Sequence, residues 1–497
     1  MPHNQGPKRI PSRQEFIKSA SVGSITPLYV GLPDFASPAA VYKAFSGQGS
    51  ALLESAKGPF NIARYSFVCF DPYCEYTIKN GSEVTRQIRT GKTRKAIEHR
   101  PLRSIKALLK AYNQSPVDGL PPFQGGAIAL FCYDFVHYLE KLPATTEDDL
   151  DLPDAHILMV DKLIAFDHML KKAWAIVCPG AAGGIRDWGL AYDDAIRQLQ
   201  SISDKAGNIV AGADEPHKAG TLEITRHCTE DEYTSMVDRG KEYIASGDIF
   251  QANLSLRLSA EIGSISPWTL YERLREINPS PFAGFLDFGT YQIASSSPER
   301  LVKIDSGIVQ TRPIAGTRPR EGGTAKDEAM RKELLLSDKE RAEHIMLIDL
   351  ERNDIGKVCD YGSVSVDELM ITEDYSHVIH IVSNVRGRLA SNKSLVDIVR
   401  ATFPGGTITG VPKVRCMEII DELEKTRRGP YTGSFGYMGF SGNMDLNIII
   451  RTFTIKGGRA YVQAGAGIVA DSMPEREYKE SLRKAEALIK TLQSLSP

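Results

Sequence analysis

The 497-residue chain lacks any apolar run close to the roughly 20 residues that a membrane-spanning helix requires. Residues 1–25 are polar and basic without an apolar core, so we expect no signal peptide. The net charge is only −2, with 60 basic and 62 acidic side chains, and gives no global field that would attract nucleic acid or an anionic membrane. Internal repeats and low-complexity tracts are also missing. These absences argue against a membrane protein and against a nucleic-acid-binding protein.

Cysteine is scarce as well. Seven cysteines are scattered along the chain, and no two are spaced as in a C-x-x-C pair. Disulfide frameworks and structural zinc sites need an organised spacing, so the pattern argues against both. We expect reduced thiols that mostly serve packing, and a cytoplasmic location.

Two long segments of different texture are separated by a polar stretch. Residues 203–221 are rich in Gly, Ala, Asp and Lys and show no apolar period. Such composition is typical of a linker. The sequence therefore predicts an N-terminal domain over residues 1–202, a linker over 203–224 and a C-terminal domain over 225–497.

Short strand-like runs bounded by turn residues dominate the chain. A capping box at residues 229–232 predicts a helix that runs to residue 246. Strands are predicted at 51–53, 65–68, 126–131, 157–160, 173–177, 249–258, 285–288, 291–295, 301–304, 309–311, 448–454 and 460–464. Further helices are predicted at 187–201, 268–277, 414–423 and 474–492. Hairpins with interposed helices predict an α+β fold with a large, mainly antiparallel sheet.

Four carboxylates lie in two helical registers far apart in the chain. Glu340 and Glu343 are three residues apart, as are Glu477 and Glu480, and Lys484 follows one turn later. This spacing puts each pair on one helix face. Two acidic faces brought together favour a hard divalent cation between them, although solvated faces with local salt bridges would show the same spacing.

Three glycine turns lie in the second half, at residues 311–318, 403–413 and 465–467. Backbone amides can approach an anion closely at such turns, but each turn alone is also compatible with a plain chain reversal. Glu299, after Ser-Pro, adds a candidate acid. His380 adds an imidazole, which beside apolar residues is also typical of a satisfied core group.

Taken in order, these segments resemble the chorismate-utilising enzymes, most closely the large subunits of anthranilate synthase and aminodeoxychorismate synthase. The resemblance covers nearly the whole chain, from residue 52 to Lys484, and is strongest over residues 311–484. It implies a two-lobed α+β fold with large antiparallel sheets and helices packed outside them.

The resemblance also implies roles for individual residues. Glu343 and Glu480 match the Mg²⁺ ligands of the family, with Glu340 and Glu477 holding metal-bound waters. Glu299 matches the general acid, and His380 and Thr407 line the same pocket. The positions that match the chorismate-binding residues are Gly316, Thr317, Tyr431, Arg451, Gly465, Ala466, Gly467 and Lys484. In chemical terms, Arg451 can grip a carboxylate with its fork of donors and Lys484 adds a point charge.

Gln251 separates two chemistries within the family. Members that add water to chorismate carry a lysine base at this position, whereas an amide cannot deprotonate water and can accept a hydrogen bond from ammonia. The sequence therefore favours an ammonia-using enzyme. No Cys-His-Glu glutaminase triad is apparent, so we expect a separate glutamine amidotransferase subunit as partner, in a heterodimer.

The product is predicted from finer differences. Many aminodeoxychorismate synthases carry a covalent lysine where this chain has Ala315, but one branch carries alanine, so this position leaves both products open. Residues 278–283 depart from the Pro-Tyr-Met with which anthranilate synthases hold tryptophan, and 123–128 and 434–437 resemble the Bacillus-type aminodeoxychorismate synthase component I. We expect aminodeoxychorismate synthesis for 4-aminobenzoate and folate. The alternatives are an anthranilate synthase component I and a non-catalytic paralogue that binds chorismate or tryptophan. A tryptophan pocket would include Ser55, Pro281 and Phe282.

Overall fold

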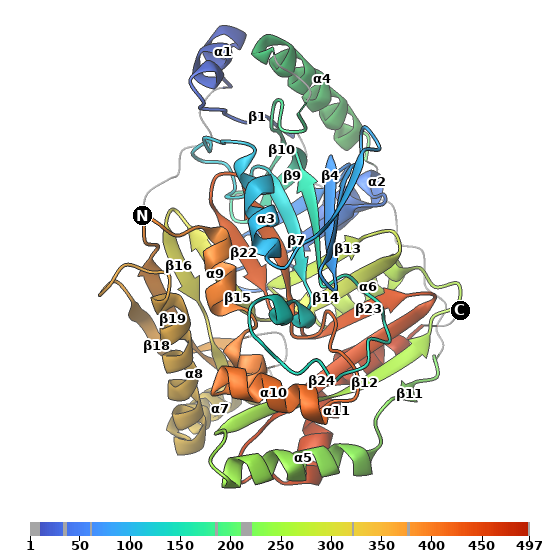
Figure 1. Ribbon diagram of the computed structural model, residues 1–497, viewed down its shortest axis with the longest axis vertical. Coiled ribbons are helices and arrows are strands. Elements are labelled where there is room, and N and C mark those ends of the chain that lie inside the picture. The colour runs from blue at the N-terminus through green and yellow to red at the C-terminus, as the bar shows by residue number, and fades with distance from the viewer. Residues whose placement is uncertain are drawn as a thin grey trace.

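The computed structural model describes residues 10–32, 37–59, 62–183, 187–209, 221–320, 323–374 and 378–495. Within these residues the strands form two twelve-stranded sheets, and every strand pairing is antiparallel. Helices flank the sheets (Figure 1). The predicted α+β class and its mainly antiparallel sheets are therefore confirmed.

The first sheet is ordered β1 (Leu28–Gly31), β10 (Lys172–Val177), β9 (Lys162–Asp167), β3 (Tyr65–Cys69), β2 (Ser50–Glu54), β13 (Phe282–Asp287), β14 (Tyr291–Ser297), β23 (Thr452–Lys456), β24 (Arg459–Ile468), β12 (Gln251–Glu261) and β11 (Thr225–Arg226), and β20 (Gly410–Val411) also pairs with β12. The second is ordered β17 (Ile314–Pro319), β19 (Val378–Arg388), β16 (Ile308–Thr311), β15 (Arg300–Asp305), β22 (Met444–Asn447), β21 (Ser434–Gly439), β7 (Gly126–Phe131), β8 (Ala155–Val160), β4 (Cys74–Lys79), β5 (Ser82–Gln87) and β6 (Thr93–Ile97), and β18 (Ser365–Asp374) also pairs with β19.

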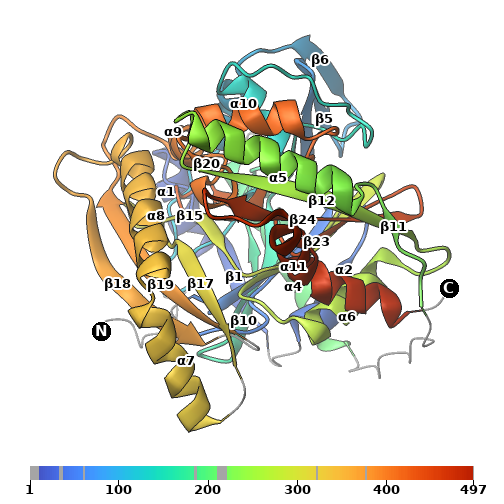
Figure 2. The same cartoon turned by 90° about the horizontal axis from the view of Figure 1, so that it is seen from below.

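The helices are α1 (Arg13–Ser21), α2 (Pro38–Phe45), α3 (Pro101–Lys110), α4 (Trp188–Gly207), α5 (Glu230–Ala245), α6 (Pro267–Ile277), α7 (Thr324–Leu336), α8 (Asp338–Gly356), α9 (Leu395–Thr402), α10 (Lys413–Leu423) and α11 (Pro474–Gln493), with short 3-10 turns at Tyr133–Tyr138 and Gly406–Ile408. Figure 2 shows α5, α10 and α11 on the side of β12 and β24, and α8 beside β17 and β19. No helix of the described residues is long and apolar enough to cross a membrane.

Both sheets combine strands from the two predicted domains. In the first sheet β2 pairs with β13, and in the second β7 pairs with β21. All six residues of β7 are buried, because β7 lies inside its sheet. Apolar side chains of both sheets share one core cluster. The helix α4 continues to Gly207, past the predicted start of the linker at residue 203, and residues 210–220 lie outside the described part. The domain division itself stays a prediction.

The predicted strand over 448–454 is wrong in its first half. The strand β22 ends at Asn447 and β23 begins at Thr452, and the two belong to different sheets. Residues 448–451 carry the chain from one sheet to the other, and Arg451 completes this crossover with a left-handed φ of 53°. Ile448 and Ile449 are buried at the crossover. A buried crossover favours apolar residues just as a strand does, so the apolar run at this point did not indicate a strand.

Candidate functional site

The candidate site lies where the chain crosses twice between the two sheets. One crossover joins β14 to β15 and holds Glu299, and the other joins β22 to β23 and holds Arg451. The two run side by side, because the Ile448 amide donates to the Glu299 carbonyl (3.0 Å) and the Ser296 amide donates to the Arg451 carbonyl (3.1 Å). These backbone hydrogen bonds between the two crossovers bring Glu299, the candidate acid, and Arg451, the candidate anion-binding residue, to one place.

Glu299 has the properties of an acid that works near neutral pH. Its side chain is buried, and burial raises the pKa of its carboxyl to about 7. The Thr407 hydroxyl donates to Glu299 Oε1 at 2.8 Å, and this bond, with the charges of Arg451 and Lys484, lowers the pKa against the effect of burial. A carboxyl with such a pKa can donate a proton to a leaving group at physiological pH.

Two cations supply positive charge to the same region. Burial lowers the pKa of Arg451, while the negative charges of Glu480 and Glu299 and the Tyr431 side chain raise it. Lys484, on α11, donates from Nζ to the Gly465 carbonyl at 3.1 Å. Burial lowers the pKa of Lys484 too, and the nearby carboxylates oppose this shift. Both cations are partly desolvated, which strengthens their attraction for an anionic substrate.

The glycines of β24 make room for Gln251 on the neighbouring strand. A Cβ added to Gly467 would lie 2.3 Å from Gln251 Nε2, and one added to Gly465 would lie 2.4 Å from the Leu254 carbonyl oxygen. Side chains at both positions would collide with β12. Ala466 turns its small side chain into the core, so only its backbone remains for a ligand.

The glycine turn at residues 311–318 is held against His380. Gly316 has φ 61°, and a Cβ there would lie 2.8 Å from Glu340 Oε2. His380 Nδ1 lies 3.0 Å from the Gly316 carbonyl oxygen, and burial lowers the pKa of the imidazole to about 4. A neutral ring with Nδ1 on a carbonyl must carry its proton on Nδ1. Thr317 pairs with His380 across the sheet, but its side chain lies outside the described part.

The four predicted metal-site carboxylates come from α8 and α11. Gln251 Nε2 donates to Glu343 Oε1 at 3.4 Å, Glu340 pairs with Arg318 (3.2 Å) and Glu480 with Arg483 (2.8 Å). Glu343 on α8 and Glu477 and Glu480 on α11 all raise the pKa of Lys484. Among the residues that the structure describes, no three His, Cys, Asp or Glu side chains are grouped as metal ligands. The metal site therefore stays a prediction.

Tyr431 belongs to a buried network that sequence reasoning missed. Burial raises the pKa of Tyr431 to about 12, and the Arg428 guanidinium lies 5.6 Å from its ring centroid. Arg428 pairs with Glu424 (2.7 Å) and donates to the carbonyls of Ile408 (3.1 Å) and Asn253 (2.6 Å). It thus ties β12 to the segment that carries Thr407. In the sequence, only the i, i+4 spacing of Glu424 and Arg428 just before Gly-Pro-Tyr could have indicated this ion pair.

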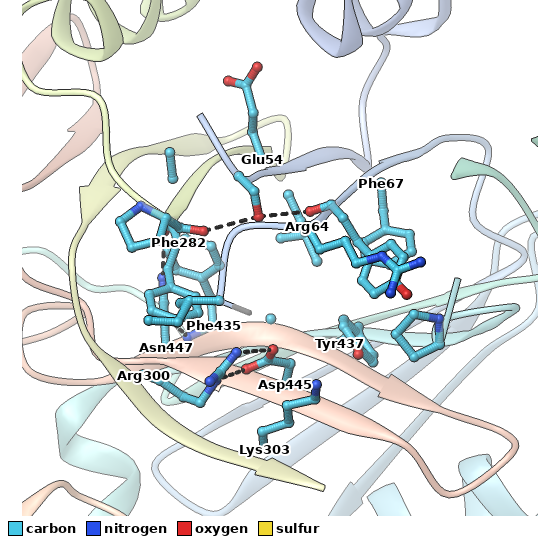
Figure 3. A pocket seen from close by; sticks show the side chains of 18 of the residues that line it. Glu54, Arg64, Phe67, Phe282, Arg300, Lys303, Phe435, Tyr437, Asp445 and Asn447 are labelled. Carbon is cyan, nitrogen blue, oxygen red and sulfur yellow. Dashed lines mark hydrogen bonds and ion pairs between the residues drawn. The ribbon is translucent and has the colours of Figure 1, made fainter. Parts of the chain in front are cut away.

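The residues predicted for a tryptophan pocket line a separate cavity of about 260 Å³. Ser55 donates to the carbonyls of Tyr65 (2.8 Å) and Pro281 (3.2 Å). Figure 3 shows Arg300 bound to Asp445 beneath the cavity, with Phe282 on one side and Tyr437 on the other. Glu54 points away toward Arg275 (2.7 Å). Ser55, Pro281 and Phe282 therefore lie together, apart from Glu299 and its partners.

Comparisons with known proteins agree over most of the chain. A family profile described as chorismate binding enzyme matches residues 48–490. The chain is 42% identical over 469 residues to anthranilate synthase component 1 of Acetivibrio thermocellus, covering 93% of each, and 44% identical over 445 residues to aminodeoxychorismate synthase component 1 of Bacillus subtilis, covering 89% of this chain and 91% of the relative. Among solved structures, anthranilate synthase component I from Streptococcus pneumoniae aligns with a TM-score of 0.77 at 35% identity, covering 93% of this chain and 99% of that one.

Proposed function

Because the chain belongs to the chorismate-binding enzyme family, we propose that it is the large subunit of an aminodeoxychorismate synthase. In this function it aminates chorismate with ammonia to give 4-amino-4-deoxychorismate, the precursor of 4-aminobenzoate in folate synthesis. The observation that carries the amination is the position of Gln251, whose amide lies against Glu343 and the backbone of Gly467. A neutral amide there can orient ammonia but cannot act as a base toward water.

Glu299 supplies the proton for the reaction, and Arg451 and Lys484 bind the substrate. Protonated Glu299 donates a proton to the C4 hydroxyl as it leaves, which its pKa of about 7 permits at neutral pH. Arg451 and Lys484 hold the carboxylates of chorismate, since both are cations in a partly desolvated site. Tyr431 acts on the charge of Arg451, and Lys484 donates to the Gly465 carbonyl, so Tyr431 and residues 465–467 adjoin these cations.

Mg²⁺ fits the donor set, which consists of carboxylate oxygens. Glu343 and Glu480 would hold the ion and Glu340 and Glu477 its waters; when bound, it would neutralise a substrate carboxylate and fix its position. Mg²⁺ usually takes only one or two protein carboxylates and keeps several waters. Glu343 on α8 and Glu477 and Glu480 on α11 all act on the charge of Lys484, and this shared partner supports the assignment.

A separate glutamine amidotransferase would supply the ammonia. The relatives are named component 1, which is consistent with a second component in those proteins. All seven cysteines of this chain have free thiols, and burial raises the pKa of each, so none suits a thiolate nucleophile. Free thiols also support the cytoplasm as the setting.

Anthranilate synthesis is the second candidate, and the relatives named anthranilate synthase support it equally. The deciding experiment incubates the purified chain with chorismate, Mg²⁺ and ammonium chloride at raised pH, where free ammonia is present. The expected product is 4-amino-4-deoxychorismate, which a PLP-dependent lyase converts to 4-aminobenzoate, with anthranilate at most a minor product. Anthranilate fluorescence without lyase would instead favour anthranilate synthase. Isochorismate would overturn amination, and chorismate binding without turnover would favour a non-catalytic paralogue.

A further inference from the structure

The hydroxyl that bonds to Glu299 comes from a loop packed directly on α8. Thr407 lies in the 3-10 turn Gly406–Ile408, and Thr409 Oγ1 closes this turn by donating to the Gly405 carbonyl at 2.9 Å. A Cβ added to Gly406 would lie 2.0 Å from Leu350 Cδ2 on α8. Because nothing separates the loop from this helix, the position of Thr407 depends on how the loop is fixed to α8.

Lys413 makes that attachment. Its Nζ donates to Asp354 Oδ2 on α8 (2.5 Å) and to the carbonyls of Thr402 (3.2 Å) and Pro404 (3.0 Å) at the start of the loop. Three bonds use all three ammonium hydrogens. The Lys413 side chain is 16% exposed and that of Asp354 is 3% exposed, so water cannot readily replace these contacts.

We propose that Lys413 is a positioning residue for the acid: by fixing the loop to α8 through Asp354, it keeps the Thr407 hydroxyl on Glu299. It does not touch Glu299 in any hydrogen bond or ion pair that the structure gives, and it acts only through the loop. This proposal rests on the proposed function in one respect, since its readout is the turnover of chorismate.

The pH profile distinguishes positioning from plain stabilisation. The groups that set the pKa of Glu299 are Thr407 on the loop, Arg451 on the crossover and Lys484 on α11, while Glu351 on α8 interacts with it as a like charge. The Thr407 bond stabilises the carboxylate and lowers the pKa. Losing that bond raises the pKa of Glu299, so the alkaline limb of kcat moves to higher pH.

The test compares Lys413→Met with Lys357→Met. The Lys357 ammonium binds the other oxygen of the same carboxylate, Asp354 Oδ1, at 2.9 Å, but the Lys357 side chain is 52% exposed and donates only to Asp354 in the described structure. We expect Lys413→Met to lower kcat about 10- to 100-fold, a typical effect of a small displacement of a reacting group, and to move the alkaline limb upward. Lys357→Met should leave kcat and the limb unchanged. Lys413→Arg, which keeps charge and donors, should restore most of kcat.

A double-mutant cycle with Thr407→Val tests whether the effect of Lys413 on Glu299 passes through Thr407. If Lys413 acts through Thr407, Lys413→Met produces no further shift of the limb in the Thr407→Val background. Should Lys413→Met fail to fold, Asp354→Asn breaks the same ion pair from the other side and should shift the limb alike. An unmoved limb in a folded variant, or additive shifts in the cycle, would overturn the proposal. Failure of the proposed function would be visible separately, as a wild-type chain that does not aminate chorismate.

Discussion

Glu299 and Arg300 are neighbours in the chain but lie in different surroundings. Glu299 lies in the crossover between β14 and β15, whereas Arg300 begins β15 and lines the cavity of about 260 Å³. Around Glu299, charged groups are buried with incomplete pairing. Burial raises the pKa of Glu299 and lowers the pKa of Arg451 and of Lys484. Around Arg300, charges are matched, as Arg300 binds Asp445 through two bonds of 2.8 and 3.0 Å. Perturbed groups of the first kind are typical of catalysis, and matched pairs beside an open cavity are typical of structure or ligand binding.

The largest expected effect lies in the metal carboxylates of the first region. Glu343→Gln or Glu480→Gln should abolish turnover with the fold intact, since each removes a charge without changing volume and should cost several kcal/mol of transition-state stabilisation. Steady-state kinetics with Mg²⁺, alongside circular dichroism, would measure this. The matched control is Glu475→Gln in the exposed first turn of α11, which should behave as wild type. Full activity in EDTA, or in either variant, would contradict the assignment.

Removing the acid should have the next largest effect. Glu299→Gln should lower kcat about 10²- to 10⁴-fold, the usual contribution of a general acid. In the wild type kcat should fall as pH rises through about 7, because the proton leaves Glu299. The same raised pKa makes ionisation of Glu299 destabilising, so folding stability should decline as pH rises from about 4.5 through about 7, and the decline should be smaller in the glutamine variant. Thermal melts over this pH range would test it, and an equal pH dependence in both proteins would show that the pKa of Glu299 is not raised.

Arg451→Lys should affect substrate affinity more than the chemical step. The charge remains but the fork of donors is lost, so chorismate binding should weaken by about 1.5–3 kcal/mol, the usual worth of a hydrogen bond to a charged group. Titration of chorismate followed by kinetics would give this as a rise in KM. An unchanged KM would mean that Arg451 does not hold the substrate.

Local patterns predicted much of the fold. The capping box at Thr229 predicted the start of α5, and the apolar run of residues 126–131 predicted β7. The pairing of β7 with β21 was beyond such reasoning, because cross-strand partners three hundred residues apart leave no local signal. The same limit explains the error at Ile448, where burial at a crossover resembles a strand.

For the site, helical spacing predicted that Glu340 and Glu343 share one helix face and that Glu477 and Glu480 share another. The resemblance to the family predicted that the two pairs belong to one metal site. The supporting residues could not be predicted. Lys413 and Asp354 meet only because α8 packs on the loop, and Arg428 bridges segments that no motif connects. Residues that act through tertiary contacts need the structure to be found.

The smallest expected effect lies in the second cavity. Ala283→Met would narrow this cavity, which Ala283 lines together with Phe282 and Ser55. Because Glu299, Arg451 and Lys484 take no part in that lining, kcat and KM should stay near wild type, although crowding a packed site can cost about 1–3 kcal/mol of stability. Phe282 packs against the Arg300 guanidinium at 4.8 Å and supplies no hydroxyl, so micromolar tryptophan should leave wild-type turnover almost unchanged. Initial rates with and without tryptophan would measure this in both proteins. Strong inhibition of the wild type that Ala283→Met relieves would show that the two regions are coupled through the Glu299–Arg300 segment, and would favour anthranilate synthesis.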